Sequence, residues 1–154
     1  MNWFVIYTKS RQEKKVALEL EKMGITVYCP MINQIRQWSD RKKKVEVPLI
    51  SSYVFVQLKE RDREAVFEVP GIVRYVYWLE KPAIVRDEEI AVMKAWLSTQ
   101  TVEAKVEGLR RGDRMKVSSG IFEGKKGFVE EISKNRVLLL LPDLGMKITL
   151  NRNL

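Results

Sequence analysis

Histidine is absent from this chain of 154 residues, and cysteine occurs only once, as Cys29. Without histidine there is no general base for a Ser-His-Asp or Cys-His relay, which excludes the hydrolases built on those groups. A zinc or haem site with histidine ligands is excluded for the same reason, and one cysteine cannot supply a cysteine-rich zinc site. No internal disulfide can form, which fits a reducing compartment. We therefore expect a protein without metal or cofactor that is not an enzyme.

Long apolar runs are missing as well. No stretch approaches the ~20 residues needed to span a bilayer, and Met1–Tyr7 lacks the basic flank and apolar core of a secretory signal. These absences predict a cytoplasmic protein without a membrane partner. The chain instead carries positive charge, with 28 Lys+Arg against 20 Asp+Glu and a net charge of +8. Such an excess favours a nucleic-acid partner, although a solvated lysine-rich surface gives the same count.

Residues 1–97 alternate strand and helix patterns. Runs of aromatic and β-branched residues predict four strands, at Trp3–Tyr7, Ile25–Cys29, Ser52–Lys59 and Ile72–Trp78. Helices are expected after Ser10–Glu13, which has the spacing of a capping box, and after Asp62 and Asp87. A hairpin with a basic tip at Ser39–Lys43 is expected between the second and third strands. The order β-α-β, hairpin, β-α-β-α predicts an α+β fold that begins with a ferredoxin-like α/β sandwich.

The composition changes after residue 97. Residues 98–108 have little apolar content and are predicted to form a linker. Residues 109–154 contain only short strand-like runs separated by glycines, which predicts a small β-barrel. Val137–Leu141 is apolar on both faces, as expected of a strand that crosses the centre of such a barrel.

Several segments carry a resemblance to a known family. In the first half these are Trp3–Tyr7, Arg11–Val16, Ser52–Val56 and Val69–Val76, and in the second half they are Gly112–Val117 and Gly120–Ile132. Together they resemble the NusG family of bacterial transcription elongation factors, whose second domain is a KOW domain. Trp38–Leu49 is similar to specialised RfaH-like paralogues, above all to the capsule-locus antiterminators of Bacteroides-like bacteria. The resemblance implies an NGN-like domain at 1–97 and an SH3-like KOW barrel at 109–154.

The resemblance also implies a docking surface. NusG-type N-terminal domains dock on the clamp helices of RNA polymerase through an exposed apolar patch, and the matching positions here are Tyr7, Leu49, Ile50, Tyr53 and Phe55. Aromatic and aliphatic anchors inside a polar rim are what such a patch needs. The alternative is that most of these residues form the core of two central strands.

Two basic clusters are candidates for nucleic-acid contact in the elongation complex. The resemblance to RfaH-like proteins implies that the first reads non-template DNA, and the second is placed to touch upstream DNA or the polymerase. The first lies at the junction of the first strand and helix and comprises Lys9, Arg11, Lys14 and Lys15. The second lies at the hairpin tip and comprises Arg41, Lys42, Lys43 and Lys44. Basic side chains beside a helix N-terminus suit phosphates, and unpaired bases stack on nearby aromatic rings. The alternative for both clusters is a solvated basic surface.

The expected function is transcription elongation or antitermination. A protein of this kind binds bacterial RNA polymerase, suppresses pausing and promotes readthrough of selected long operons. The KOW domain is expected to recruit a ribosomal protein or a termination factor, and the chain is expected to act as a monomer. The competing hypothesis is a ribosome-associated or general RNA-binding protein, because KOW-like barrels also occur in ribosomal proteins.

Overall fold

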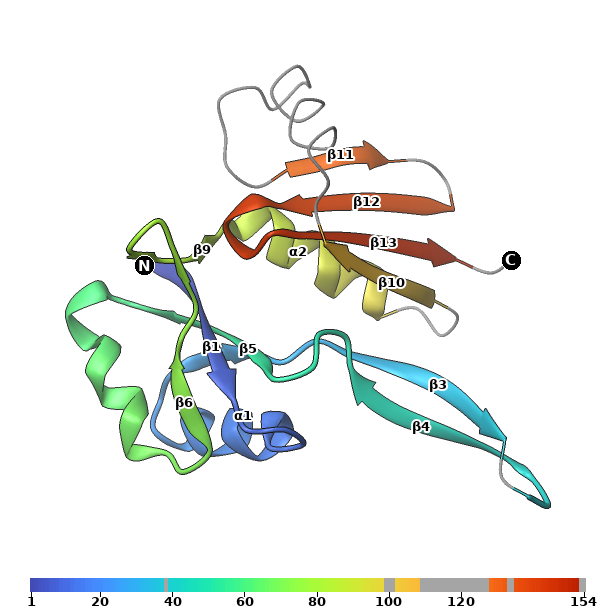
Figure 1. The fold of residues 1–154 in the computed structure, drawn as a ribbon, viewed down its shortest axis with the longest axis horizontal. Coiled ribbons are helices and arrows are strands. Elements are labelled where there is room, and N and C mark those ends of the chain that lie inside the picture. Colours follow the sequence, from blue (N-terminus) through green and yellow to red (C-terminus); the bar gives the residue numbers. More distant parts are fainter. Residues whose placement is uncertain (38, 99–101, 109–127, 133–134, 153–154) are drawn as a thin grey trace.

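The N-terminal half is built on one antiparallel sheet, in a computed structural model that describes residues 1–37, 39–98, 102–108, 128–132 and 135–152 (Figure 1). The strands are β1 (Asn2–Thr8), β2 (Thr26–Tyr28), β5 (Tyr53–Leu58) and β6 (Ile72–Tyr75). Their order in the sheet is β2-β5-β1-β6, and β9 (Ile84–Val85) pairs with the start of β1. This is the strand order of a ferredoxin-like sandwich, so the predicted α+β fold is confirmed.

One face of this sheet is covered by elements close to it in sequence. The helix α1 (Glu13–Lys22) connects β1 to β2, and the 3-10 helix η1 (Glu60–Glu68) connects β5 to β6. Strand alternation sends Phe4 and Ile6 of β1 to this side, where they pack in one core cluster with Leu20 of α1 and Val66 of η1. We call this the local face.

The opposite face carries the second core cluster. Trp3 and Val5 of β1 and Phe55 of β5 point to this side and pack with helix α2 (Asp87–Leu97). The apolar stripe Ile90, Met93 and Trp96 of α2 is buried, as its helical spacing predicts. The same cluster extends into the C-terminal half of the chain, so we call this side the shared face.

The C-terminal half is a second antiparallel sheet, with the order β10-β13-β12-β11. Its strands are β10 (Val102–Gly108), β11 (Phe128–Ile132), β12 (Arg136–Leu141) and β13 (Met146–Arg152), with the 3-10 turn η2 (Pro142–Leu144) between the last two. All of Val137–Leu141 is buried, as expected for a central strand. The remaining barrel strand predicted between 109 and 127 lies outside the described residues.

Strand β10 occupies part of the predicted linker. Val102, Ala104 and Val106 alternate with charged residues, pack against the shared core and pair in register with β13. The alternation covers only a few residues, and half of them are charged. The composition alone therefore suggested a connecting segment. The C-terminal sheet therefore begins before residue 109.

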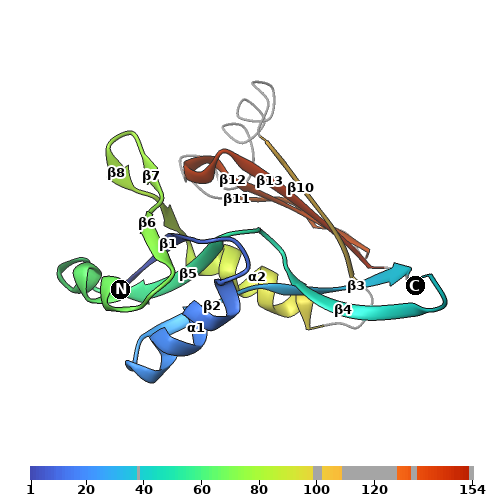
Figure 2. The same cartoon turned by 60° about the horizontal axis from the view of Figure 1, so that its bottom comes forward.

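Two hairpins extend from the sandwich. Strands β3 (Met31–Gln37) and β4 (Lys42–Pro48) form a two-stranded arm that extends beyond the N-terminal sheet (Figures 1 and 2). Near its base, β3 contacts β10 and Ile32 packs against the shared core. Strands β7 (Tyr77–Trp78) and β8 (Lys81–Pro82) form a shorter hairpin before β9. Within the described part of the chain, no helix is long and apolar enough to cross a membrane.

Candidate functional site

An exposed aromatic row lies where β1 ends. Tyr7 of β1 faces Tyr53 on β5 and Arg74 on β6 in the strand register, so the three side chains share one side of the sheet. The rings of Tyr7 and Tyr53 meet edge to face with centroids 6.1 Å apart, and the Arg74 guanidinium lies 5.5 Å from the Tyr7 centroid. Tyr7 is 37% exposed and Tyr53 is partly buried. The row thus offers aromatic edges and a cation to a partner.

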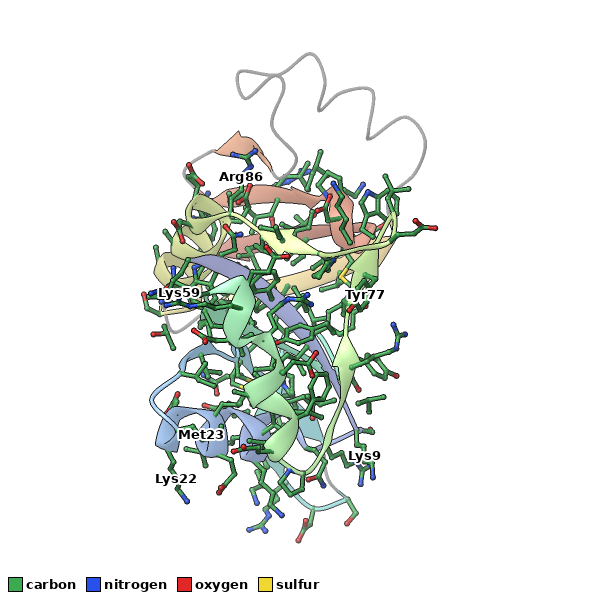
Figure 3. All side chains as sticks on the ribbon, turned by 90° about the vertical axis from the view of Figure 1, so that its left-hand side faces the viewer. Lys9, Lys22, Met23, Lys59, Tyr77 and Arg86 are labelled. Carbon is green, nitrogen blue, oxygen red and sulfur yellow. The ribbon has the colours of Figure 1, made fainter. Side chains whose placement is uncertain are left out.

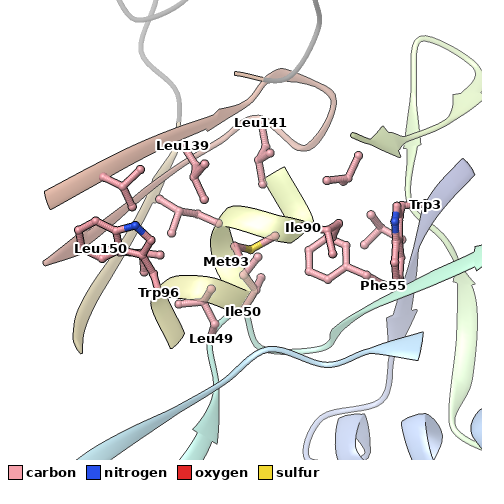
Figure 4. Packing of buried hydrophobic residues seen from close by; sticks show 14 residues of the cluster. Trp3, Leu49, Ile50, Phe55, Ile90, Met93, Trp96, Leu139, Leu141 and Leu150 are labelled. Atoms are coloured by element: carbon pink, nitrogen blue, oxygen red, sulfur yellow. The ribbon is translucent and has the colours of Figure 1, made fainter. Parts of the chain in front are cut away.

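The other three predicted docking residues lie in the core. Leu49 and Ile50, in the connection between β4 and β5, are 7% and 6% exposed, and Phe55 is fully buried. Figure 4 shows Met93 of α2 between Ile50 on one side and Leu139 of the C-terminal sheet on the other. The burial of these three residues agrees with the alternative interpretation, in which they belong to the core instead of an exposed patch. They become available to a partner only if α2 and the C-terminal sheet move away.

The first basic cluster sits on a tight turn. The Lys9 amide donates to the Gly71 carbonyl at 2.9 Å, and the Gln12 amide donates to the Lys9 carbonyl at 3.1 Å. Arg11 has a left-handed backbone with φ of 64°, which closes the turn just before α1. Lys9, Arg11, Lys14 and Lys15 are all exposed. Lys9 lies farther from the C-terminal sheet than Tyr77 does (Figure 3).

The predicted capping box is wrong, and the reason bears on this site. Helix α1 begins at Glu13, with Gln12 at the N-cap and no side-chain hydrogen bond there. The buried Glu13 carboxylate instead accepts a hydrogen bond from the Ser52 amide at 2.9 Å. Ser52 has a left-handed φ of 67° and precedes Tyr53. Glu13 therefore fixes the turn that positions Tyr53 beside the basic junction.

The second basic cluster lies on the arm. Arg41, Lys42 and Lys43 are exposed, and Lys44 lies on β4 opposite Ile35. The register places two pairs of basic or polar positions at the tip, Arg36 with Lys43 and Gln37 with Lys42. Positive charge is thus concentrated where the arm is farthest from the body of the molecule.

The family is decided by the first 94 residues of the chain. A family model described as "Transcription termination factor nusG" matches residues 1–94. The chain belongs to the NusG family.

Relatives of this NusG-family chain are similar over most of its length. A protein named "Transcription termination/antitermination protein NusG" from Streptococcus pyogenes serotype M3 is 29% identical, over 93% of this chain and 87% of the relative. A protein of the same name from Staphylococcus carnosus is 27% identical, over 89% and 82%. A solved structure described as "Domain interaction in Thermotoga maritima NusG" is 21% identical, covers 95% of this chain and 96% of its own, and has a TM-score of 0.40.

Two charged residues of this NusG-family chain were not singled out from the sequence. Arg74 belongs to the aromatic row only through its register with Tyr7. Glu46 on β4 of the arm forms an ion pair with Lys14 at the start of α1, with 3.5 Å between Oε1 and Nζ. Both contacts join segments more than 30 residues apart. No local pattern marks them, and knowledge of the strand register was needed to find them.

Cys29 is partly buried and packs against the local core, as a small apolar residue does. Burial raises the pKa of its thiol to about 11, and the carboxylates of Glu13 and Glu46 raise it further while Lys14 lowers it. The thiol is therefore protonated at neutral pH, and the nucleophilic thiolate is scarce. Among the described residues, no group of three or more acidic, histidine or cysteine side chains is placed to hold a metal ion.

Proposed function

We propose that the protein is a transcription elongation and antitermination factor of the specialised, RfaH-like kind, which acts by binding RNA polymerase and not by catalysis. The observation that supports this most strongly is the exposed row of Tyr53, Tyr7 and Arg74 on a NusG-family domain. Tyrosine and arginine are enriched among the residues that dominate protein interfaces. The relatives from Streptococcus and Staphylococcus carry names that refer to transcription termination and antitermination.

In this proposal the aromatic row docks on the clamp helices of the polymerase. Tyr7 and Tyr53 supply the apolar anchors, and Arg74 and Lys9 supply a polar rim. Docking favours the closed clamp over the opened, paused state. The size of this effect is set by the difference between the protein's binding free energies for the two states of the polymerase. The two basic clusters then lie against the nucleic acid of the elongation complex, and operon choice depends on that contact.

Leu49, Ile50 and Phe55 enter the interface only in a second arrangement. Their side chains lie beneath α2, which itself packs against the C-terminal sheet. Docking through Tyr7 and Tyr53 needs no such movement. A C-terminal sheet that has left α2 exposes its own apolar residues, such as Leu139 and Ile148, and is then free to recruit a ribosomal protein or a termination factor.

The test is transcription of a long natural template by purified RNA polymerase with and without the protein. We expect fewer pauses and more full-length transcript with the wild-type chain, and loss of both effects with Tyr53→Asp or Tyr7→Ala. Tyr77→Ala is the matched control, because Tyr77 is 51% exposed but lies on the β7–β8 hairpin.

Three outcomes contradict the proposal or part of it. No change in pausing on any natural leader sequence rejects the function. Unfolding of Tyr53→Asp, seen by circular dichroism, makes Tyr53 a core residue instead of an anchor. Co-purification with ribosomes and not with polymerase supports the competing hypothesis of a ribosome-associated protein.

A further inference from the structure

The C-terminal sheet is joined to α2 by a short tether. Helix α2 ends at Leu97, Ser98 is its C-cap and β10 begins at Val102, so three residues, 99–101, lie between the cap and the strand. An extended chain advances at most about 3.6 Å per residue, which limits the distance from Ser98 to Val102 to about 14 Å. A helix with its side chains is about 10–12 Å wide. The start of β10 therefore stays within little more than one helix diameter of the end of α2.

Helix α2 is held to the N-terminal sheet by polar as well as apolar contacts. Asp87, in its first turn, accepts a hydrogen bond from the Trp3 indole at 2.8 Å. Lys94, in its last turn, places its ammonium 5.4 Å from the Trp3 ring centroid and 5.3 Å from that of Tyr28, on β2. Both ends of α2 are thus tied to the strands beneath it. We therefore expect α2 to stay with the N-terminal sheet when the C-terminal sheet leaves.

Strand β10 is buried less than the other strands of its sheet whose side chains are described. None of its seven residues is buried, whereas β12 buries Val137–Leu141 and β13 buries Ile148 and Leu150. Charged side chains alternate with apolar ones along the strand, and they are Glu103, Lys105 and Glu107. A segment with this much charge and little apolar surface is well solvated when it is unpaired. The sequence of β10 therefore suits a strand and a solvated linker alike.

Unpairing of β10 lengthens the tether and leaves the rest of the sheet in place. Within the described residues β10 pairs with β13 alone, position by position from Val102 to Gly108. Strand β13 also pairs with β12, from Met146 to Asn151, and this pairing does not involve β10. Release of β10 adds its seven residues to the tether and raises the maximum reach beyond Ser98 to about 40 Å.

We propose that β10 is a releasable strand, which pairs with β13 while the C-terminal sheet covers α2 and unpairs to become the linker when that sheet leaves. This rests on the second arrangement in the proposed function and names the step that permits it. A sheet that swings about residues 99–101 with β10 still paired uncovers the first turn of α2 but stays close to its last turn. Ordering and disordering of one segment is a common way to connect two arrangements of the same chain.

The test follows one thiol placed between α2 and the C-terminal sheet. Met93 is fully buried, faces Leu139 and lies about 6 Å along the helix from Leu97, where a swinging sheet gives little access (Figure 4). The alkylation rate of Met93→Cys in a Cys29→Ser background therefore reports how often the sheet leaves. Lys105→Gly weakens β10 at a partly exposed position and should speed alkylation about two- to fivefold.

A longer tether should abolish this dependence on β10. With ten glycine and serine residues inserted between Ser98 and Val102, the sheet can leave α2 while β10 stays paired. Lys105→Gly should then change the alkylation rate by less than about 1.5-fold. Thr26→Gly is the matched control, because it weakens β2, an edge strand of the N-terminal sheet, in the same way. It should leave the rate unchanged with either tether.

Three results overturn the proposal. The first is equal acceleration by Lys105→Gly with both tethers, or by Thr26→Gly, which assigns the effect to general destabilisation. The second is no acceleration by Lys105→Gly with the short tether. The third is hydrogen exchange in which the amides of β10 stay protected while the thiol at position 93 reacts.

Hydrogen exchange of the unsubstituted chain decides the question if Met93→Cys fails to fold. The amides of β10 should then exchange as often as those of α2, or more often, and slower exchange in β10 overturns the proposal. All these measurements are made without polymerase. Their failure therefore leaves docking through Tyr7 and Tyr53 standing, and loss of docking leaves the releasable strand standing.

Discussion

The two faces of the N-terminal sheet are closed in different ways. The local face is sealed by α1 and η1, and every buried residue of its core lies between Phe4 and Tyr75. The shared face is sealed by α2 and by apolar residues of β12 and β13, which are more than 80 positions from β1. One half of the sandwich is thus complete within a short stretch of chain, whereas the other is completed by a distant sheet.

The difference bears directly on function. Of the five predicted polymerase-docking residues, Leu49, Ile50 and Phe55 belong to the shared core. Tyr53 is partly buried and packs against that core, and Tyr7 is exposed beside it. A surface completed by a distant segment can be exposed by moving that segment, without unfolding the local face. The availability of these three residues therefore depends on the C-terminal sheet, whereas Tyr7 is already exposed.

The largest effect is expected from breaking the local face. Phe4 is 2% exposed, its ring meets Tyr75 edge to face at 6.0 Å, and the Arg63 guanidinium lies 5.7 Å from its centroid. Phe4→Ala removes a buried aromatic ring and should lower the free energy of unfolding by about 3–5 kcal/mol. Chemical denaturation followed by circular dichroism measures this loss.

A second phenylalanine on the same side provides the control. Phe67 on η1 also meets Tyr75 edge to face, at 5.8 Å, but is 45% exposed. Phe67→Ala should cost less than about 1 kcal/mol, because an exposed ring loses little burial. Similar losses for the two variants would mean that the local face is not a closed core.

A smaller and more localised effect is expected on the shared face. Leu139 of β12 is fully buried and packs in the cluster that contains Met93 and Ile50. Leu139→Ala should cost about 2–4 kcal/mol through the cavity that it leaves. It should also speed hydrogen exchange at the amides of α2, because that helix loses its cover while the local face keeps its own.

The neighbouring residue tests whether this response follows the face and not the strand. Leu138 is 8% exposed and points to the other side of β12, outside the shared cluster. Leu138→Ala should destabilise the C-terminal sheet and leave exchange in α2 close to that of the wild type. Faster exchange in α2 with both variants would show that the sheet and helix unfold as one unit.

The same comparison explains what could be predicted from the sequence. The strands of the N-terminal sheet are rich in apolar and β-branched residues, as in Tyr53–Leu58, and the helices of the local face are adjacent to them in the chain. The ferredoxin-like order therefore followed from pattern alone. Glu13 was misassigned because a local capping box and a bond to Ser52 use the same residue types. The burial of Leu49 and Ile50 was not predictable, since it depends on strands almost 90 residues later.

A pH-dependent effect is expected at Glu89, on the first turn of α2. Its side chain is 1% exposed, and Oε2 has no hydrogen-bond partner within the described part of the chain. Burial raises the pKa of this carboxyl, and the neighbouring carboxylate of Glu88 raises the pKa further. Hydrogen bonds from the backbone of Glu89 and Arg86 lower the pKa but do not cancel the effect of burial. A raised pKa in the folded state means that the folded chain binds this proton more tightly than the unfolded chain does.

The sign of the effect follows from that difference. Protonated Glu89 stabilises the fold fully when the pH is below about 4, the pKa of a glutamate in the unfolded chain. This contribution is lost as the pH rises through the higher pKa of Glu89 in the folded chain. Glu89→Gln keeps the acceptor oxygen and removes the charge, so it should stabilise the protein at pH 7 by about 1 kcal/mol and by almost nothing near pH 4. Thermal unfolding of both proteins across this range measures the gain. A constant difference at every pH would exclude titration of Glu89 as its cause.

The smallest effect, and the finest comparison of the two faces, uses the single thiol. Cys29 packs against the local core, and a pKa of about 11 leaves only about one thousandth of it as thiolate at pH 8, so alkylation should be slow. Phe4→Ala opens the local face and should speed the reaction several-fold, whereas Leu139→Ala should leave its rate unchanged. Equal acceleration by both variants, followed by mass spectrometry, would mean that loosening the shared face also loosens the local one. The predicted independence of the two faces would then be wrong, and a moving C-terminal sheet could not expose Leu49 and Ile50 without disturbing the rest of the sandwich.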